Sequence, residues 1–486
     1  MADSSPSDPV ARSSADVGDP APAHEGTPQR GQWTSKIGFV LAAAGSAIGL
    51  GNIWRFPYVA GQNGGGAFVI VYLACIAFIC VPYLFAELAL GRHSQKNPVG
   101  AIEAIKGRTP WALVGGLCVL TGIFILSYYG VIAGWTFGYI FKNVVSPETQ
   151  FADFIARPGL VIPLFALFLG FTAAIVYGGV ENGIERAAKV LMPVLLVLML
   201  LVIVRSVTLE GASKGLSFYL NPDFSKLTGT AVVAALGQAF FSLSLGMGAM
   251  ITYGSYLPKS ENLLSAGGYV ALFDTGIALL AGLMIFPAVF ALGGDPSAGP
   301  ALVFVTLPEL FQEMPLGTGV GIAFFLLLSV AALTSTVSLL EMVVSYFIDE
   351  RKWSRAKSVF VVIGFTFLVG LPAALSQGMN ETLTDMTWLV GEGGFLGATD
   401  FLSIMDAIWG NISLALGAFL LCVFAGWVWG AADAAAEIRS GAGRFTPGVA
   451  QVWGFFVTYI CPVVILVVLL EAMQVLDVIT ASLGLG

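Results

Sequence analysis

Apolar positions along this chain fall into long runs that are separated by short polar connections. A helix needs about 20 predominantly apolar residues to cross a bilayer, and eleven runs approach or exceed that length. The connection from Gly299 to Met314 is apolar but brief, so we expect an additional amphipathic helix there. The predicted transmembrane spans are 36–59, 64–91, 111–142, 158–178, 186–206, 231–257, 263–293, 316–349, 356–376, 399–432 and 448–472.

Two of these runs are interrupted near their middle by glycines and small polar residues. The breaks lie at Gly45–Asn52 and Ser242–Gly248. Glycine lowers helix propensity by about 1 kcal/mol per residue, and unpaired backbone groups inside lipid persist only where they line a cavity. A broken helix in each half of a membrane chain indicates the substrate site of a transporter. Glycine kinks for close helix packing are the alternative, and that alternative would explain one break more readily than two.

The two interrupted spans, the first and the sixth, each open a unit of five spans. Because five is odd, the second unit must insert upside down relative to the first, which is the arrangement of an inverted repeat. We therefore predict an all-α polytopic membrane protein with a 5+5 inverted repeat and helices 1 and 6 broken at mid-membrane. The expected parts are a disordered cytoplasmic tail at 1–29, repeats at 30–210 and 211–435, and span 11 with a short extracellular tail at 436–486.

Composition narrows the class of protein further. The chain is 57% hydrophobic and 11% charged, which excludes an ordinary soluble domain, and its net charge of -8 argues against a nucleic-acid partner. Sixteen of the 22 Lys and Arg residues fall on one side of the predicted topology, which places the N-terminus in the cytoplasm and the protein in the inner or plasma membrane. The tail at 1–29 lacks the apolar core of a cleaved signal peptide. The five cysteines match no metal motif.

Four stretches of the chain carry a family resemblance. They are GSAIGLGNIWRFPYVAGQNGGGAF (45–68), FFSLSLGMGAMITYGSY (240–256), GPALVFVTLP (299–308) and ALTSTVSLLEMVVSYFIDE (332–350). Together they resemble the neurotransmitter:sodium symporter family, and among its members the bacterial eleven-span transporters of hydrophobic amino acids. The resemblance implies sodium-coupled import of hydrophobic and aromatic L-amino acids by alternating access.

The same resemblance implies two Na⁺ sites, and hard cations of this kind prefer oxygen ligands. Back-bonding of Thr334 and Ser335 to the preceding helical turn is the alternative for these two hydroxyls, but matching carbonyls on span 1 favour a sodium site. The first site would use Ala47, Asn52, Ser242, Asp274 and the substrate carboxylate. The second would use Gly45, Ile48, Ala331, Thr334 and Ser335.

Asp274 lies in the middle of span 7, where the family commonly has asparagine. An acidic residue inside the membrane is costly and is therefore a functional hypothesis by default. Relatives with asparagine need a bound chloride or a nearby glutamate, and Ala278 stands where that glutamate would lie. The resemblance thus implies chloride independence, with the negative charge on Asp274 itself. Tyr72, Gln238 and Ser242 match the other chloride-site positions, but they could equally pair with Asp274. A buried, protonated, purely structural Asp274 is the alternative.

The substrate is expected to bind at the first break. Gly49 stands where monoamine transporters have an aspartate for the substrate amine, so glycine favours an α-amino acid. The start of a half-helix is partly positive and suits a carboxylate, which the Tyr129 hydroxyl would also meet. Met247 replaces a phenylalanine of narrower pockets and is flexible, so we expect room for aromatic side chains. The predicted substrate-binding residues are Ala47, Gly49, Gly51, Ile125, Tyr129, Phe241, Ser242, Ser244, Met247, Thr334 and Leu339.

Several charged residues resemble the gates of the family. Opposite charges that meet in only one conformation bias alternating access. Arg30 and Asp349 could instead be ordinary surface charges, whereas Arg55 within the membrane has no such interpretation. Asp400 is a rival to the deeper Asp406. The predicted gates are Arg30, Trp33, Arg55, Asp349 and Asp406, and Glu87 is expected to hold the inner network together.

Two other functions remain as alternatives to a sodium-coupled symporter. A proton-coupled amino-acid transporter of the same fold is disfavoured by Thr334 and Ser335, and a non-transporting amino-acid sensor is disfavoured by the short cytoplasmic loops. An enzyme is not expected, because the chain shows no nucleophile–base set and no cofactor motif. The expected ligands and partners are two Na⁺ ions, a small amino acid and the lipid bilayer, with no nucleic acid and no obligatory protein partner.

Overall fold

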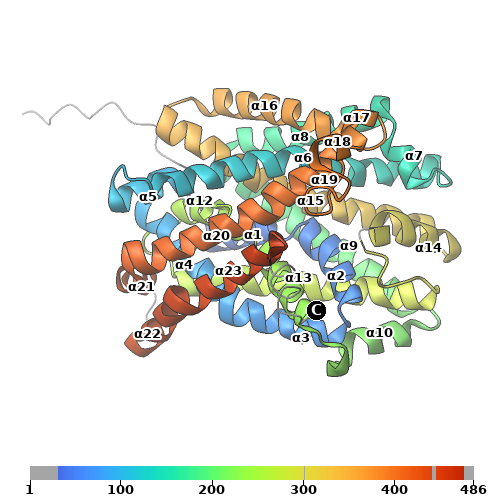
Figure 1. The fold of residues 1–486 in the computed structure, drawn as a ribbon, viewed down its shortest axis with the longest axis horizontal. Helices are drawn as coiled ribbons and strands as arrows, with labels where there is room; N and C mark the ends of the chain where they lie inside the picture. The colour runs from blue at the N-terminus through green and yellow to red at the C-terminus, as the bar shows by residue number, and fades with distance from the viewer. Residues whose placement is uncertain (1–30, 300, 441–444, 476–486) are drawn as a thin grey trace, which may run out of the picture.

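The computed structural model describes residues 31–299, 301–440 and 445–475. In these ranges nearly all regular structure is helical, and the strand-like pairing is limited to one isolated bridge between Phe395 and Ala398. Most of the long helices run roughly along the longest axis of the molecule, with α1 near the middle of the bundle (Figure 1). The predicted disordered tail at 1–29 lies outside the described residues.

Nine helical runs in the described part of the chain are long and apolar enough to cross a membrane. They match nine predicted spans within a few residues, with two exceptions. The run predicted at 186–206 already begins at Val180, and the run predicted at 399–432 continues to Arg439. The nine runs are Gly66–Ser94 (α3, η2 and α4), Ala112–Val145 (α6), Pro158–Tyr177 (α8), Val180–Val207 (η3 and α9), Leu263–Ala291 (α13), Gly317–Arg351 (α15), Arg355–Leu375 (α16), Phe401–Arg439 (α19, η6, α20, η7 and α21) and Pro447–Ala472 (α22, η8 and α23).

The first predicted broken span is confirmed as a bent pair of helices. Helix α1 (Lys36–Ala47) ends where Ile48 adopts an extended conformation. The chain becomes helical again in η1 (Gly51–Arg55), which continues into α2 (Phe56–Gln62). The two parts are bent by 53° relative to each other. The start of α1 is set locally, because Ser35 caps it by accepting a hydrogen bond from the Gly38 N–H.

The second predicted broken span is also present as two helices, each too short to cross a membrane alone. Helix α11 (Gly229–Ser242) and helix α12 (Ala249–Ser255) are separated by the non-helical residues 243–248. Gly246 and Gly248 have φ angles of 87° and 82°, which residues with a side chain rarely adopt. The break therefore falls at the glycines that predicted it. The bent pair brings the candidate membrane spans in the described residues to ten. Helices α11 and α12 occupy the place of the predicted span 231–257, so the count of eleven stays a prediction.

Short helices fill several connections. The helix predicted between Gly299 and Met314 is confirmed as η5 (Leu302–Thr306) followed by α14 (Leu307–Glu313). The sequence pattern did not predict the other short helices. They are α5 (Pro98–Lys106), α7 (Phe151–Ile155), α10 (Ala212–Leu220), η4 (Phe224–Lys226), α17 (Glu381–Thr384) and α18 (Thr387–Val390).

The core is built around α6 and α15. These two helices have 78% and 72% of their most apolar stretch buried, against 28% for the η3–α9 run and 33% for α8. Helix α6 packs along α15, and α1 contacts both α13 and α15. The outer helices therefore present apolar side chains to lipid, while the broken helices lie in the protein interior, where freed backbone groups can find partners.

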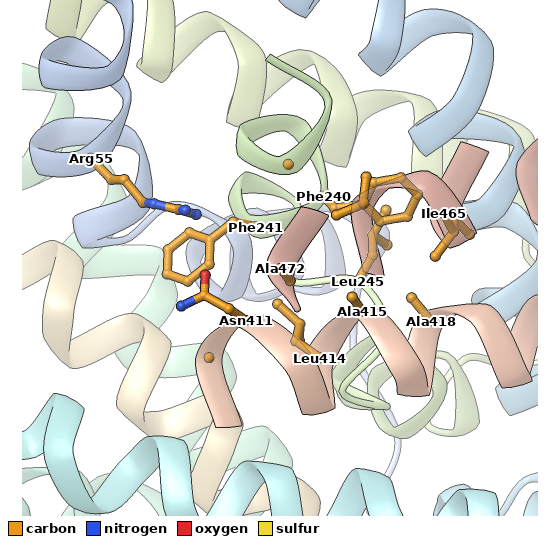
Figure 2. Close-up of a pocket in the computed structure, with 13 residues that line it drawn as sticks. Arg55, Phe240, Phe241, Leu245, Asn411, Leu414, Ala415, Ala418, Ile465 and Ala472 are labelled. Carbon is orange, nitrogen blue, oxygen red and sulfur yellow. The ribbon is translucent and has the colours of Figure 1, made fainter. Parts of the chain in front are cut away.

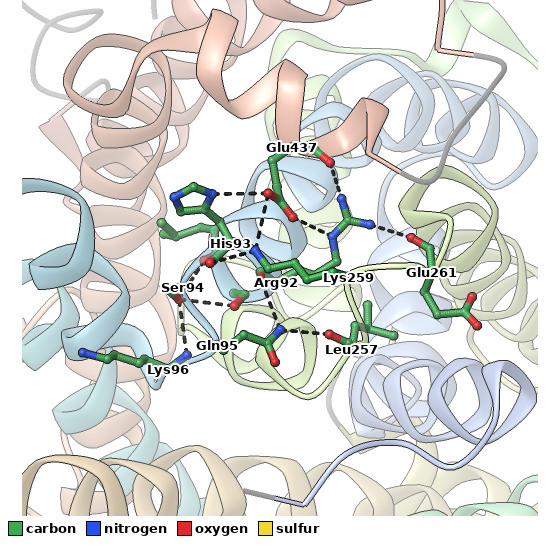
Figure 3. A network of polar contacts seen from close by, with 11 residues as sticks. Arg92, His93, Ser94, Gln95, Lys96, Leu257, Lys259, Glu261 and Glu437 are labelled. Carbon is green, nitrogen blue, oxygen red and sulfur yellow. Dashed lines mark hydrogen bonds and ion pairs between the residues drawn. The ribbon is translucent and has the colours of Figure 1, made fainter. Parts of the chain in front are cut away.

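A charged network joins the ends of three runs that are far apart in the sequence (Figure 3). Arg92, at the end of α4, is fully buried, and its Nε donates to Glu437 Oε1 of α21 at 2.7 Å. Its other nitrogens donate to the backbone oxygens of Glu437 and Glu261. His93 Nδ1 and Lys259 Nζ lie 3.2 and 3.6 Å from Glu437 Oε2. The network thus fixes α21 against α4 and the connection that precedes α13.

We expect Glu437→Gln to destabilise the folded protein, because the buried Arg92 guanidinium would lose its counter-charge. Removing one partner of a buried ion pair costs about 3–5 kcal/mol. The matched control is Lys259→Met, which removes a half-exposed charge from the same carboxylate and should cost less than about 1 kcal/mol. Thermal inactivation of the detergent-purified variants measures both effects. Equal stability of the two variants would contradict this role of Arg92 and Glu437.

Candidate functional site

The two helix breaks meet at the centre of the molecule, and glycine is required there for close approach. A Cβ on Gly49 would lie 2.4 Å from Ser335 Oγ and 2.9 Å from Tyr129 Oη. A Cβ on Gly51 would lie 2.9 Å from the Phe241 ring. The first break is therefore in direct contact with α6, α11 and α15. Freed backbone groups and side-chain hydroxyls from four elements converge at this place.

Three residues of the predicted first sodium site form one buried cluster. Asn52 Nδ2 donates to Asp274 Oδ1 at 2.7 Å and to Ser242 Oγ at 2.9 Å. Ser242 Oγ donates to Asp274 Oδ2 at 2.9 Å, and Tyr72 Oη donates to Ser242 Oγ at 3.2 Å. The cluster links η1, α3, α11 and α13. Its carboxylate, amide and hydroxyl groups are the donor types that a hard cation prefers.

The neighbouring polar groups satisfy the broken backbone. Gly49 N donates to Asn52 Oδ1 at 3.1 Å, and Gln238 Nε2 donates to the Gly51 carbonyl at 2.8 Å. Gln238 Oε1 is buried and accepts no hydrogen bond from any described residue. Of the positions that match a chloride site, Ser242 pairs directly with Asp274 and Tyr72 pairs with Ser242. Gln238 instead supports the start of η1.

The residues predicted for the second sodium site also lie together, between α1 and α15. The hydroxyls of Thr334 and Ser335 each donate to the Ile48 carbonyl at 3.4 Å. Thr334 Oγ1 donates to the Ala331 carbonyl at 2.9 Å, so the expected back-bonding to the preceding turn occurs as well. Gly45 packs against Thr334, since a Cβ there would lie 3.2 Å from Thr334 Cβ. The Ser46 carbonyl, which was not predicted, accepts from Ser335 Oγ at 3.3 Å.

Two of the predicted substrate-binding residues, Tyr129 and Ser244, form hydrogen bonds with the backbone of the first break. Tyr129 Oη accepts a hydrogen bond from the Leu50 N–H at 3.0 Å. Ser244, in the second break, donates to the Ser46 carbonyl at 3.2 Å. The apolar side chains of Ile125, Met247 and Leu339 are buried on α6, in the second break and on α15. The first break therefore has polar groups at Gly49 and Tyr129. The three predicted apolar side chains are buried on α6, in the second break and on α15.

A cavity of about 390 Å³ leads away from this cluster on the side of Arg55. Gly51, Tyr129 and Phe241 line its inner end, while Trp135 and Phe304 line its walls. Its lining is mainly aromatic and apolar. The cavity thus adjoins the first break and offers space lined mainly by apolar groups.

The predicted gate residues Arg55 and Asp406 both line this cavity. Tyr128 Oη donates to Asp406 Oδ1 at 2.8 Å, and Arg55 lies over the Phe241 ring at 4.5 Å. The structure therefore places the two charges in one cavity without a direct ion pair between them. Asp400, the rival of Asp406, caps α19 by accepting a hydrogen bond from the Ser403 N–H.

Phe241 also separates the aromatic cavity from a smaller apolar cavity of about 50 Å³. Figure 2 shows Arg55 and Asn411 beside the Phe241 ring, with Leu414 and Ile465 farther along the smaller cavity. The space lies between α11, α20 and α23. Phe241 and Arg55 can therefore change position without displacing a fully packed wall.

The opposite side of the break is closed by packed aromatic residues. Trp33 is 5% exposed, and its Nε1 donates to the Tyr253 carbonyl at 3.0 Å. Its ring lies edge-on to those of Tyr253 and Tyr256, at centroid distances of 5.3 and 6.1 Å. Asp349 accepts hydrogen bonds from the backbone and side chain of Asn97. Its predicted partner Arg30 lies outside the described residues, so that pair stays a prediction.

Sequence reasoning missed several buried acidic residues on this closed side. Glu341 accepts hydrogen bonds from Tyr256 Oη at 2.6 Å and from both terminal nitrogens of Arg355 at 2.7 and 2.8 Å. Glu185 accepts from Thr34 Oγ1 at 2.6 Å. A lone acidic residue within an apolar run was the signal that could have identified Glu341. Its partners could not be identified, because they lie on other helices.

Glu87 has a different place from the one expected. Its Oε1 accepts a hydrogen bond from the Gly246 N–H at 2.8 Å, so it supports the second helix break. Its Oε2 is buried and has no hydrogen-bond partner among the described residues. Glu87 therefore belongs to the second break, and the charged and aromatic groups on the closed side are held by other residues.

Comparison with known proteins identifies the family. The profile of the Sodium:neurotransmitter symporter family matches residues 30–152 and 149–482. The chain is 39% identical over 457 residues to "Uncharacterized sodium-dependent transporter YhdH" of Bacillus subtilis (strain 168), covering 92% of this chain and 98% of that protein. It is 31% identical over 408 residues to the sodium-dependent serotonin transporter of Drosophila melanogaster, covering 72% of this chain and 65% of that protein.

A solved structure agrees with this assignment. The fold is similar to the crystal structure of MhsT in complex with L-phenylalanine, with a TM-score of 0.80 and 44% sequence identity over 91% of this chain and all of that one. The predicted helical transporter fold is thus confirmed, and the protein is a multi-pass membrane transporter and not an enzyme. The chain belongs to the sodium:neurotransmitter symporter family of sodium-dependent transporters.

Proposed function

We propose that this protein imports hydrophobic and aromatic L-amino acids together with two Na⁺ ions, by alternating access and without chloride. The observation that carries this function is the buried cluster of Asn52, Ser242 and Asp274 between the two helix breaks. The cluster combines a carboxylate with neutral oxygens next to freed backbone groups. The sodium dependence of the family favours it over a proton-coupled transporter or a sensor.

The first Na⁺ would bind beside the Asp274 carboxylate. Asn52 Nδ2 now faces Asp274, and its Oδ1 accepts from the Gly49 N–H. A half-turn of the amide exchanges these two atoms, so that Oδ1 faces the cation and the Gly49 N–H is released. That N–H then becomes available to a substrate carboxylate. Cation binding at Asp274 and substrate binding at Gly49 would thus be coupled through one side chain.

The second Na⁺ would bind between α1 and α15. The hydroxyls of Thr334 and Ser335 each lie 3.4 Å from the Ile48 carbonyl oxygen. Both hydroxyls can turn their protons away, and each then offers a lone pair to a cation. An ion at this place would hold the end of α1 against α15 and so stabilise one arrangement of the broken helix.

The substrate would use the polar side of the break for its amino-acid backbone and the apolar side for its side chain. The amides after Gly49 and the Tyr129 hydroxyl suit a carboxylate. Because position 49 is glycine, it provides no carboxylate to pair with the amine of a substrate that lacks a carboxylate of its own. The L-phenylalanine named with the related MhsT structure is consistent with a substrate of this class.

We expect binding of radiolabelled phenylalanine to purified protein to require Na⁺, because the ion and the substrate carboxylate share the first break. Linkage makes the effect reciprocal, so substrate should raise Na⁺ affinity equally. Thr334→Val should lower the affinity for Na⁺ about tenfold, because the loss of one oxygen ligand costs roughly 1.4 kcal/mol. Thr366→Val, a buried threonine of α16 whose hydroxyl has no partner among the described residues, is the control. Undiminished binding in choline would refute the proposed function.

Met247→Phe should weaken tryptophan binding more than leucine binding. The Met247 side chain is buried, and added volume in a packed site costs about 1–3 kcal/mol for the larger ligand. Competition by each amino acid against one radioligand gives the ratio of the two affinities, which does not depend on the amount of folded protein. Met473→Phe changes an exposed methionine and is the control. A ratio equal to that of the wild type would show that Met247 lies outside the substrate pocket.

Sodium-driven uptake into proteoliposomes should be equal in chloride and in gluconate, because Asp274 supplies the negative charge beside the first Na⁺. Asp274→Asn removes that charge while keeping an oxygen ligand. The variant should need chloride, for which Tyr72 and Ser242 offer hydroxyl donors and Ala278 leaves space. Asp295→Asn, which removes an exposed acid, should behave as the wild type. Chloride dependence of the wild-type protein would exclude this role of Asp274.

A further inference from the structure

A third cavity, of about 260 Å³, lies at the end of α6 and contains none of the candidate ion or substrate residues described above. The last turns of α6, the segment 147–151 and the helices η5 and α14 enclose it. Its lining includes one lysine, Lys142, and two glutamates, Glu148 and Glu309. The cavity is smaller than the roughly 300–1,000 Å³ typical of sites for drug-sized ligands, so its size suits one small molecule.

Lys142 is the buried charge of this cavity. The residue is only 7% exposed, and its Nζ lies 5.2 Å from the centre of the Tyr139 ring. The ammonium group donates one hydrogen bond, to the Pro147 carbonyl at 2.9 Å. An ammonium has three N–H donors, and no ion pair in the described part of the chain includes this one. A buried charge normally has a counter-charge, so Lys142 is set up to receive an anionic group.

The two glutamates supply the opposite charge on the other walls. Their carboxylates are exposed to solvent and close enough to Lys142 to interact electrostatically without direct contact. One positive and two negative groups are therefore held apart around a single cavity. This arrangement is complementary to a molecule that carries both charges, with its carboxylate at Lys142 and its ammonium at Glu148 and Glu309.

The new cavity shares a wall with the aromatic cavity that leads to the helix break. Phe151 and Phe304 line both spaces. Their rings are stacked, with centroids 5.2 Å apart and planes inclined by 16°. Phe304 is buried, whereas Phe151 is only partly buried. The two stacked rings therefore form a partition between the charged cavity and the aromatic one.

On the basis of the proposed function, we propose that the cavity at Lys142 is a reception site that binds a zwitterionic α-amino acid before the amino acid moves to the helix break. The two exposed glutamates contribute little individually, so binding there is weak and its effect is on rates. The site raises the local concentration of substrate next to the Phe151–Phe304 partition. Retention of the amino acid through a charge-assisted hydrogen bond to Lys142 increases the number of encounters with the helix break.

The first test measures the kinetics of radiolabelled phenylalanine binding to the full-length protein in nanodiscs with Na⁺. Lys142→Met should slow association about tenfold, because the loss of a hydrogen bond to a charged group lowers occupancy of the reception site by about that factor. Because a reception site lies on the pathway in both directions, dissociation should slow by the same factor and the Kd should stay unchanged. Lys226→Met, at an exposed lysine, is the control and should alter neither rate. Unchanged rates in Lys142→Met, or a loss of affinity in proportion to the slower association, would overturn the proposal.

The second test observes the reception site directly. Gly49→Val blocks the helix break, since its Cβ would collide with Ser335 and Tyr129. Saturation-transfer NMR on this variant should still detect millimolar phenylalanine, with or without Na⁺, but not phenethylamine, which lacks the carboxylate. Adding Lys142→Met should abolish the signal, and its persistence would overturn the proposal. If the wild-type protein binds no amino acid in Na⁺, the proposed function and this site fail together. Normal wild-type binding with no effect of Lys142→Met overturns the reception site alone.

Discussion

The structure depends on the requirement that every backbone polar group inside the membrane must have a partner. Two helices stop at mid-membrane, and their freed groups would be prohibitive in lipid. Gln238 Nε2 donates a hydrogen bond to the Gly51 carbonyl. Glu87 accepts one from the Gly246 N–H, and Asn52 accepts one from the Gly49 N–H. Asn52 is also one of the candidate ligands of the first ion site, where it contacts Ser242 and Asp274. One side chain thus both satisfies the broken backbone and contributes to the candidate ion site.

A rigid frame surrounds these breaks. Helices α6 and α15 are mostly buried and pack along each other, and α1 fits between α15 and α13. Glycine at positions 49 and 51 lets the first break touch its neighbours, because any Cβ would collide with them. Hydroxyls on α15 reach across to the carbonyls at the end of α1. The frame therefore places oxygens of α1 and α15 close together. The backbone groups freed by the first break form hydrogen bonds with side chains instead.

The two ends of the site differ in how they are closed. On the side of Arg55 an aromatic cavity leads outward, and Asp406 is held by Tyr128. On the other side Trp33 is packed against Tyr253, and the buried Glu341 of α15 forms an ion pair with Arg355 at the start of α16. One open and one closed end are what alternating access requires of a single conformation. The Arg92–Glu437 ion pair joins α4 to α21.

The sequence by itself determined the long apolar helices and the two breaks, because run length and glycine content act locally, but it did not determine most of the short helices in the connections. Asn52, Ser242 and Asp274 stood out as polar groups inside apolar runs, whereas Thr334 and Ser335 were assigned to an ion site through the family resemblance. The sequence identified neither the partners of Glu341 and Arg92 nor the cavity at Lys142. Those depend on residues 14 to 345 positions apart in the chain or on the packing of several elements. Tertiary structure alone decided which charges became paired, because pairing requires proximity that no local pattern records.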